Sequence, residues 1–260
     1  MDLYLDFKTP LHRLDPRAKV FGLLAAFALL LAFNHPLYTA GVAAVILAAA
    51  ALGRSLRNVW RLRALYLLFF LFSLVLWSVM LRGPTDIARL GPLHLTRESL
   101  LYGVAVGIRI DAMVAAGLVF LSTTRVEEFT AALRRLGLPF PVSFAFSLAF
   151  RFVPTFADSA YTIIQAQKSR GLDLESGGIF TRIRRHVPLL IPAVVGAVRT
   201  TDLLAMALES RGFGGSGPRT EYLELKARWQ DFLVSALLLV AVSAAIWWRL
   251  GGHGAVLPRV

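Results

Sequence analysis

The residues best suited to specific recognition in this sequence are two arginines in a repeated setting. Ala-x-x-Ser-Arg-Gly occurs twice, with cores Ser169-Arg170-Gly171 and Ser210-Arg211-Gly212. A glycine just past a helix adopts the left-handed conformation that ends it, and a cation in the last turn suits the negative end of the helix dipole. A planar guanidinium there can donate to a carboxylate or to carbonyls of a partner. The repetition favours two matched docking tips over two ordinary helix ends.

Each copy follows a long apolar stretch that contains proline. Arg151-Phe-Val-Pro154 precedes the first copy and Arg185-His-Val-Pro188 precedes the second. The interval from proline to arginine is 16 residues in the first copy and 23 in the second, a difference of about two helical turns. We therefore expect two proline-led helices of unequal length, each with Ser-Arg-Gly at its C-terminal end.

Other chemical signatures are missing from the sequence. A phosphate-binding loop needs a lysine after a glycine, and no lysine of this chain follows one (Lys8, Lys19, Lys168, Lys226). The five histidines show no metal-ligand spacing, and there is no cysteine for thiolate chemistry. No grouping of nucleophile and base or pair of carboxylates suggests catalysis. We expect no catalytic residue, metal or cofactor in this chain.

The composition is that of a membrane protein. Of the 260 residues, 57% are hydrophobic, and the mean hydropathy is +0.63. The chain also carries 28 Lys and Arg against 16 Asp and Glu, a formal net charge of +12. Apolar and basic character together favour an integral membrane protein with cationic loops facing the cytoplasm, and they argue against a nucleic-acid-binding protein.

The apolar runs predict an all-α protein with five membrane-spanning helices, because a span needs about 17–25 apolar residues. The expected spans lie near residues 18–33, 37–52, 64–81, 101–121 and 232–248. This divides the chain into N-terminal transmembrane helices (1–121), a cytoplasmic region that contains both Ser-Arg-Gly copies (122–228), and a final span with a tail (229–260).

The distribution of basic residues predicts the orientation. With the N-terminus inside, 22 Lys and Arg face the cytoplasm and five face outward. We therefore expect a multi-pass protein of a bacterial or archaeal cell membrane with a cytoplasmic N-terminus.

The region between the fourth and fifth spans has features of its own. Thr124 and Glu127 fit a capping box at the start of an amphipathic helix that Gly137 ends. Two apolar runs follow, at 139–150 and 187–198, each 12 residues long. Runs of this length are too short to span a bilayer. We expect a set of coupling helices at or just below the inner membrane surface.

Arg109 and Asp111 lie within the fourth expected span. Ionisable side chains are costly there, and two residues apart on a helix they point in different directions. Each needs a partner on another helix, a water-filled cavity or a second membrane protein. We favour a subunit contact or a structural role over a proton relay, which needs several acidic or histidine groups in series.

At these motifs the chain resembles the T component of energy-coupling factor (ECF) transporters, the EcfT/CbiQ family. The resemblance rests on "LHRLDPRAKV" at residues 11–20, "RFVP" at 151–154, "AQKSRG" and "AMALESRG", in the family's order and over nearly the whole chain. The family commonly has Ala-Arg-Gly where this chain has Ser169 and Ser210 before the arginines.

The resemblance implies a specific division of labour. Arg170 and Arg211 would insert into grooves on two ABC-type ATPase subunits, which bind ATP and Mg²⁺. The membrane helices would hold a separate substrate-binding subunit, the S component, and the cargo would be a vitamin or a transition-metal ion such as cobalt or nickel. The chain itself would be a non-catalytic scaffold that transmits motion.

Two other classes remain open from the residues alone. An ion-gradient-driven secondary transporter would work without an ATPase and would place charged groups in several spans. A membrane-bound enzyme would gather a nucleophile, a base or metal ligands near one face.

Overall fold

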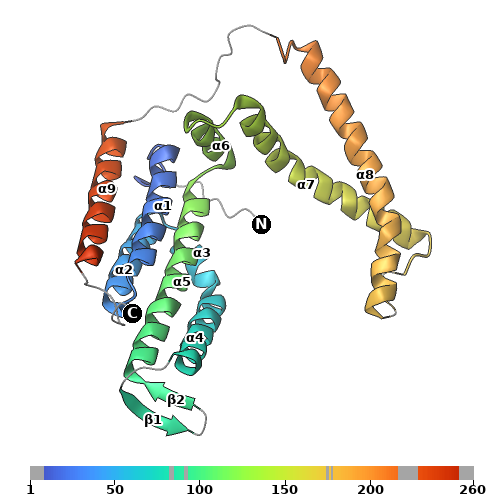
Figure 1. Ribbon diagram of the computed structural model, residues 1–260. Helices are drawn as coiled ribbons and strands as arrows, with labels where there is room; N and C mark the ends of the chain where they lie inside the picture. The colour runs from blue at the N-terminus through green and yellow to red at the C-terminus, as the bar shows by residue number, and fades with distance from the viewer. Residues whose placement is uncertain are drawn as a thin grey trace. The chain divides into compact units, whose positions relative to one another are not determined.

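The computed structural model describes residues 9–81, 85–90, 93–173, 176, 178–215 and 228–251. The chain divides into two compact units, Met1–Gly137 with Leu225–Val260 and Leu138–Glu224 (Figure 1). The second unit thus begins at Leu138, later than the boundary expected at 122. The expected C-terminal tail beyond residue 251 lies outside the described residues.

The first unit consists of helices and one β-hairpin. Its elements are α1 (Pro16–Ala32), α2 (Pro36–Leu52), α3 (Leu56–Arg61), α4 (Arg63–Met80), β1 (Asp86–Leu90), β2 (Leu93–Thr96), α5 (Arg97–Thr123), α6 (Val126–Arg135) and α9 (Trp229–Leu250). The strands pair antiparallel in the connection from α4 to α5, where the sequence predicted a loop.

Local sequence accounts for the start of several helices. Asp15 caps α1 by accepting a bond from the Arg17 N–H at 2.9 Å, and Pro16 stands in the first turn, where a missing N–H costs nothing. α5 begins with a reciprocal capping box in which Thr96 and Ser99 accept each other's backbone N–H.

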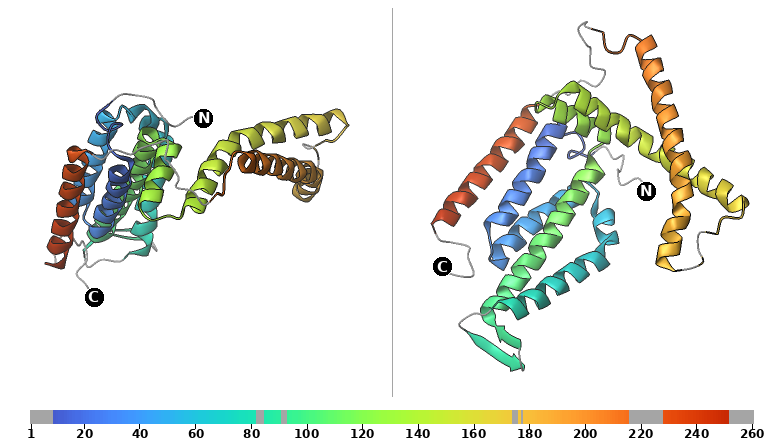
Figure 2. Two further views of the ribbon diagram at one scale, coloured as in Figure 1. Left: turned by 90° about the horizontal axis from the view of Figure 1, so that it is seen from above. Right: turned by 45° about the vertical axis from the view of Figure 1, so that its right-hand side comes forward.

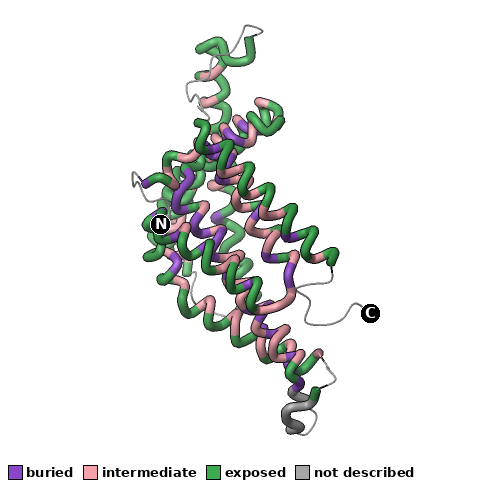
Figure 3. Tube along the Cα trace, turned by 90° about the vertical axis from the view of Figure 1, so that its left-hand side faces the viewer, coloured by how far each residue is buried: buried purple, intermediate pink, exposed green. Residues whose placement is uncertain are grey.

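α5 forms the centre of the first unit. It packs against α4, α2 and α1, and α9 packs against α1. Small residues on α5 allow this close approach. Figure 3 shows buried positions alternating with exposed ones along the helices. The buried core gathers Leu30, Ile46, Ala50, Val59 and Val119 with three alanines of α5. The core therefore lies where α1, α2 and α5 meet.

Two glycines set the contact between α4 and α5. A Cβ on Gly103 would lie 3.2 Å from Leu74 Cα, and one on Gly107 would lie 2.8 Å from the Phe70 ring. Ser73 Oγ donates to the Gly103 carbonyl at 3.1 Å in the same contact. This small-residue approach with an interhelical hydrogen bond is typical of packing between membrane helices.

The second unit consists of two long helices, α7 (Phe140–Ser169) and α8 (Ile179–Ser210). They run in opposite directions and cross (Figure 2). Apart from Ser143 and Leu189, their described residues are half-buried or exposed.

The prolines expected to lead the two helices lie inside them, while Pro139 and Pro141 stand at the start of α7. Pro154 is in α7, and Pro188 and Pro192 are in α8. The expectation that Pro154 and Pro188 lead the helices is therefore wrong; the helices are unequal in length, as expected, but α7 has 30 residues and α8 has 32. A proline interrupts one backbone hydrogen bond, and a long apolar helix tolerates that loss.

The structure has five described helices that are long and apolar enough to cross a membrane, as many as expected, but they are not the same five. α4, α5 and α9 match expected spans, and α7 and the Phe180–Ser210 part of α8 also qualify by length and composition. α1 and α2 have only 17 residues each. The two 12-residue apolar runs are thus parts of longer helices, because α7 continues past the first run through Pro154 and α8 continues through Pro188 and Pro192.

The start of α6 also differs from expectation. Its N-cap is Arg125, and no side chain caps it, so the predicted Thr124–Glu127 capping box does not form. Thr124 instead ends α5. The predicted end is confirmed, since Gly137 follows the helix with φ of 107°.

Candidate functional site

Both Ser-Arg-Gly copies end a long helix in the same way. α7 and α8 stop at the serine of each copy, so Arg170 and Arg211 are the C-capping residues. The following glycines, Gly171 and Gly212, take the left-handed conformation with φ of 86° and 77°. A Cβ on either glycine would meet nothing within 4 Å, so the backbone conformation alone favours glycine there.

The backbone hydrogen bonds of the two ends are equivalent. The N–H of Leu172 donates to Gln167 O at 3.0 Å, and the N–H of Phe213 donates to Leu208 O at 2.9 Å. The two glycine N–H groups donate to the carbonyls three residues back, at 3.0 and 2.9 Å. Together these bonds form two complete Schellman motifs. The repeated sequence therefore specifies one three-dimensional structure twice.

The side chains of each copy divide into a serine that bonds to its own helix and an arginine that extends into solvent. Ser169 Oγ donates to Gln165 O and Ser210 Oγ donates to Ala207 O, both at 3.0 Å. The hydroxyls are thus satisfied by their own helices, and each serine occupies little more space than an alanine. Arg170 and Arg211 are exposed. Each guanidinium is available to a partner beyond the helix end.

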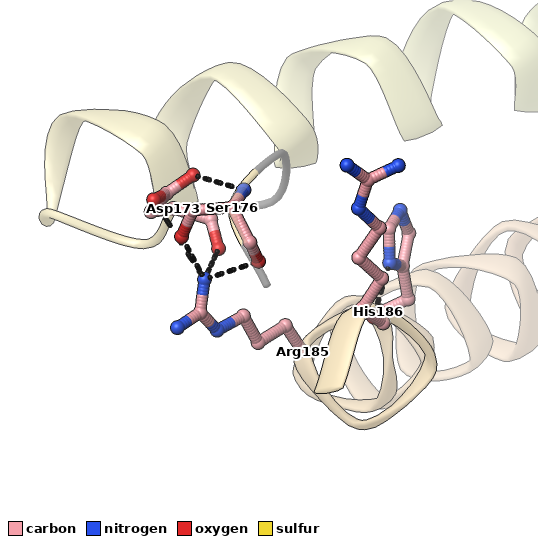
Figure 4. A network of polar contacts seen from close by, with 5 residues as sticks. Asp173, Ser176, Arg185 and His186 are labelled. Carbon is pink, nitrogen blue, oxygen red and sulfur yellow. Dashed lines mark hydrogen bonds and ion pairs between the residues drawn. The ribbon is translucent and has the colours of Figure 1, made fainter. Parts of the chain in front are cut away.

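Arg185 fixes the loop that follows the first tip. Its guanidinium donates to Asp173 O and Ser176 O at 2.9 Å and to Ser176 Oγ at 2.6 Å (Figure 4). The Asp173 carboxylate lies 3.7 Å away and accepts from the Ser176 N–H at 3.1 Å. The chain leaving Arg170 is therefore tied to α8.

Aromatic stacking fixes the second tip. The Phe213 ring lies directly after Arg211-Gly212 and packs on Phe144 and Phe140 of α7, with ring centroids 4.6 and 5.9 Å apart. The end of α8 is thus held against the start of α7. Because the helices run in opposite directions, the C-terminal ends of α7 and α8 lie toward opposite ends of the second unit (Figure 1). Arg170 and Arg211 cap these two ends.

Arg109 has its partner inside the chain. Its Nη2 donates to the Phe33 carbonyl and to Asn34 Oδ1, both at 2.6 Å, where α1 ends. A cation at this position suits the negative end of α1 and satisfies a carbonyl that the helix leaves open. The geometry therefore gives Arg109 a role in joining α5 to the α1–α2 connection.

Asp111 and Tyr66 have buried oxygens without partners. Asp111 Oδ1 and the Tyr66 hydroxyl find no hydrogen bond among the described residues. A contact with a second membrane subunit remains a prediction for Asp111.

Sequence reasoning missed a polar junction where α1 and α9 begin and α5 ends. The Asp231 carboxylate accepts from the Asp15 N–H at 2.9 Å and the Arg228 N–H at 2.7 Å. Lys19 Nζ donates to Thr123 O at 2.7 Å and to His12 O at 3.1 Å. Asp-Pro signals a helix start, but no signal pairs Asp15 with a residue 216 positions away.

This junction shows what the N-terminal motif at residues 11–20 does in the structure. Asp15, Lys19 and Asp231 are all buried, and each is bonded to backbone groups at a helix end. Such bonds offset the cost of burying a charge, although Asp15 Oδ2 finds no partner among the described residues.

Comparison with known proteins places this arrangement in a family. A profile of the CbiQ family, described as cobalt transport protein, matches residues 7–222 and so contains both Ser-Arg-Gly copies and the N-terminal motif. The chain belongs to the CbiQ family. The resemblance found in the sequence is therefore confirmed.

Named relatives agree over almost their whole length. The energy-coupling factor transporter transmembrane protein EcfT of Heliobacterium modesticaldum is 33% identical over 94% of this chain and 95% of its own. EcfT of Thermosediminibacter oceani is 34% identical over 94% and 97%, and EcfT of Staphylococcus aureus is 31% identical over 94% and 94%. The chain is a membrane transport protein of the EcfT type.

One relative has a different name and a longer chain. A putative ABC transporter ATP-binding protein of Bifidobacterium longum is 32% identical over 91% of this chain, which spans 31% of that protein's length. None of these relatives favours the ion-gradient-driven alternative.

Proposed function

We propose that this chain is the non-catalytic coupling subunit of an ECF-type importer. Its two arginine tips dock on two ABC-type ATPase subunits, and its membrane helices hold a substrate-binding S component. ATP and Mg²⁺ are bound by the ATPases. Their movement on ATP binding and hydrolysis displaces α7 and α8 and thereby the S component.

The observation that carries the proposal is the duplicated helix end. Each of the two helices has a serine hydroxyl bonded to its own last turn, the same Schellman hydrogen bonds and an exposed arginine. Helix termination alone needs only the glycine. A repeated arginine at the cap is explained when two similar surfaces must each receive a guanidinium.

The distinct anchoring of the two tips supports force transmission. Arg185 ties the loop after the first tip to α8, and Phe213 ties the second tip to α7. A load applied to either arginine therefore reaches both helices. A freely moving loop would dissipate it, so rigid supports are what a transmitting element requires.

The relatives' names are consistent with ATPase partners. The Bifidobacterium longum protein named as ATP-binding contains, within one longer chain, a region similar to this chain. Joining two activities in a single polypeptide fits an obligatory working contact between them. The description "cobalt transport protein" supports a transition-metal ion of the cobalt or nickel type as cargo. A vitamin is the alternative that the resemblance to ECF transporters implies.

The exposed apolar faces of the second unit support a membrane-embedded partner. Val194, Leu203 and Met206 of α8 are among many large apolar side chains that are more than half exposed. Apolar surface of this extent marks a contact with protein or lipid. The S component and the bilayer are the surfaces that we propose to cover it, with the N-terminus and both tips on the cytoplasmic side.

The test is the double variant Arg170→Ala/Arg211→Ala in the complete complex. Loss of an arginine anchor at a protein interface costs about 2 kcal/mol or more, roughly a 30-fold loss of affinity per tip. We expect the tagged variant to enter the membrane normally, to recover little ATPase on purification and to lose ATP-dependent uptake in reconstituted vesicles.

Arg199→Ala is the matched control, because Arg199 is an exposed arginine of α8 away from its end. It should retain ATPase recovery and uptake. Normal uptake and normal ATPase recovery in the double variant would contradict the docking role.

A further inference from the structure

The first unit contains an apolar cavity that the coupling function does not use. It has a volume of about 220 Å³ and lies among α1, α2, α5 and α9. Its walls include Leu14 and Gly22 of the α1 region, Val45 and Ala49 of α2, Val119 of α5 and Leu238 of α9. Lys19 and Thr123 are its polar lining residues, and they bond to each other. The interior therefore suits a hydrocarbon ligand.

The cavity is open on the side of α2. Val45 lines it and is nevertheless 69% exposed. Ala49, one turn further along α2, is half-buried and also lines it. In a membrane protein, the outer surface of an apolar helix such as α2 faces lipid. The opening is therefore accessible from the hydrocarbon layer.

The size of the cavity selects its occupant. A water molecule's share of liquid volume is about 30 Å³, and a methylene group is of similar size, so the cavity holds about seven methylene groups. A helix of a partner protein, about 10 Å in diameter, needs far more room. The cavity therefore fits a segment of one acyl chain.

Two arginines border the end of the cavity where α1 begins. Arg13 and Arg17 directly precede the lining residues Leu14 and Ala18. Arg13 is exposed, and Arg17 Nε is buried without a hydrogen-bond acceptor among the described residues. The nearby Asp15 carboxylate lies 4.0 Å from that atom and caps α1.

Of the acids at this end, Asp15 has one buried oxygen, Oδ2, that likewise finds no partner among the described residues, and at 4.0 Å its carboxylate makes an ion pair with Arg17 Nε but no hydrogen bond. Asp231 is bonded to the N–H groups of Asp15 and Arg228, and Lys19 is bonded to carbonyls. An external anion at the exposed Arg13 and at the partly exposed side chain of Arg17 would supply a further acceptor. A lipid phosphate lies at the depth where the apolar helix of a membrane protein ends.

We propose that this cavity binds one acyl chain of an anionic phospholipid, whose phosphate is held by Arg13 and Arg17. The lipid fills the gap between α1, α2 and α9 and joins their ends, so it acts as a structural ligand of the first unit. This site is independent of the docking of the arginine tips.

The experiment measures retained lipid on the purified full-length chain by native mass spectrometry. The detergent-solubilised chain is incubated with phosphatidylglycerol or phosphatidylcholine of equal chain length and then washed. We expect one retained phosphatidylglycerol and at least tenfold less phosphatidylcholine. The variants Val45→Trp, which closes the mouth from its exposed side, and Ala49→Leu, which fills the interior, should lower retention tenfold or more.

Ala44→Leu is the matched control, because Ala44 is an exposed residue of α2 outside the cavity lining. It should retain lipid as the unaltered chain does. Arg13→Gln/Arg17→Gln should abolish the preference for phosphatidylglycerol. The proposal is overturned if the unaltered chain retains no phosphatidylglycerol, if it retains both lipids equally, or if Val45→Trp retains as much as Ala44→Leu.

Discussion

At the scale of single residues, the two glycines after the arginines determine where the guanidiniums point. Gly171 and Gly212 have φ of 86° and 77°, and a side chain would meet no neighbour at either position. The cost of substitution is therefore purely conformational, about 1–2 kcal/mol for an L-residue held in the left-handed region. Each arginine tip thus depends on the residue that follows it.

We predict that Gly171→Ala and Gly212→Ala open the helix ends without unfolding the chain. A loss of 1–2 kcal/mol lowers the population of the capped state by a factor of about 5 to 30. Hydrogen–deuterium exchange should accelerate at the N–H groups of Leu172 and Phe213, which close the two caps. Gly196→Ala in the middle of α8 is the control, because its added Cβ also meets nothing within 4 Å. Equal protection at the caps in all three variants would show that the glycines are not needed.

The buried Asp231 shows how one residue can organise several helix ends. It accepts backbone bonds from Asp15 and Arg228 and is 5% exposed. Beside it, Lys19 bonds to the last carbonyl of α5. A buried carboxylate and a buried ammonium that are both hydrogen-bonded to helix ends specify one arrangement of α1, α5 and α9.

At the scale of elements, the contact of α4 with α5 depends on the absence of side chains. A Cβ on Gly103 would lie 3.2 Å from Leu74 Cα and 3.4 Å from its carbonyl oxygen. Backbone atoms cannot move aside as a flexible side chain can. The two helices would therefore have to separate and would lose the bond from Ser73 Oγ to Gly103 O.

We predict that Gly103→Ala destabilises the first unit by about 1–3 kcal/mol, the usual cost of overpacking. Gly117→Ala in the same helix is the control, because its Cβ would meet nothing within 4 Å. Removing a helical glycine there should stabilise the protein by up to about 1 kcal/mol. The midpoints of thermal unfolding in detergent should move in opposite directions, and a common shift would show that the interhelical contact is unimportant.

The prolines of α7 and α8 show that a proline in the sequence does not always end a helix. Pro154, Pro188 and Pro192 each remove one backbone donor, yet the helices continue through them. The 12-residue apolar runs are consequently embedded in helices of 30 and 32 residues. By length and composition, both helices are long and apolar enough to cross a membrane.

At the scale of the whole molecule, the path of the chain across the membrane decides whether the proposed function is possible. Arg170 can reach a cytoplasmic ATPase only if the connection from α7 to α8 is cytoplasmic. If α7 and α8 crossed as a hairpin, that connection would lie on the opposite side from the start of α7. The basic residues of this region favour the cytoplasmic side.

We predict that Ser176→Cys is labelled by a membrane-impermeant maleimide only in inverted vesicles, and Thr85→Cys only in right-side-out vesicles. Both positions are exposed, and the chain has no cysteine of its own to give background labelling. Thr85 precedes the β1–β2 hairpin, which the predicted topology places outside. Labelling of Ser176→Cys from the outside would remove the physical basis of the docking proposal.

The sequence by itself determined the membrane class, the family and the ends of α7 and α8. These follow from composition and from short codes, such as Ser-Arg-Gly or Asp15-Pro16, whose hydrogen bonds close within about five residues. Such a helix end can be predicted from sequence because the donor and the acceptor of each hydrogen bond lie on the same short segment.

Only the tertiary structure decided the partner of Arg109, the link from Asp15 to Asp231, the supports provided by Arg185 and Phe213, and the cavity beside Val45. These features depend on which apolar faces pack together and at what register. Helices that are apolar on nearly every side carry little information about register, because the hydrophobic effect is non-directional. Their register is set by a few glycines and buried polar groups, whose partners become evident only when the helices are in place.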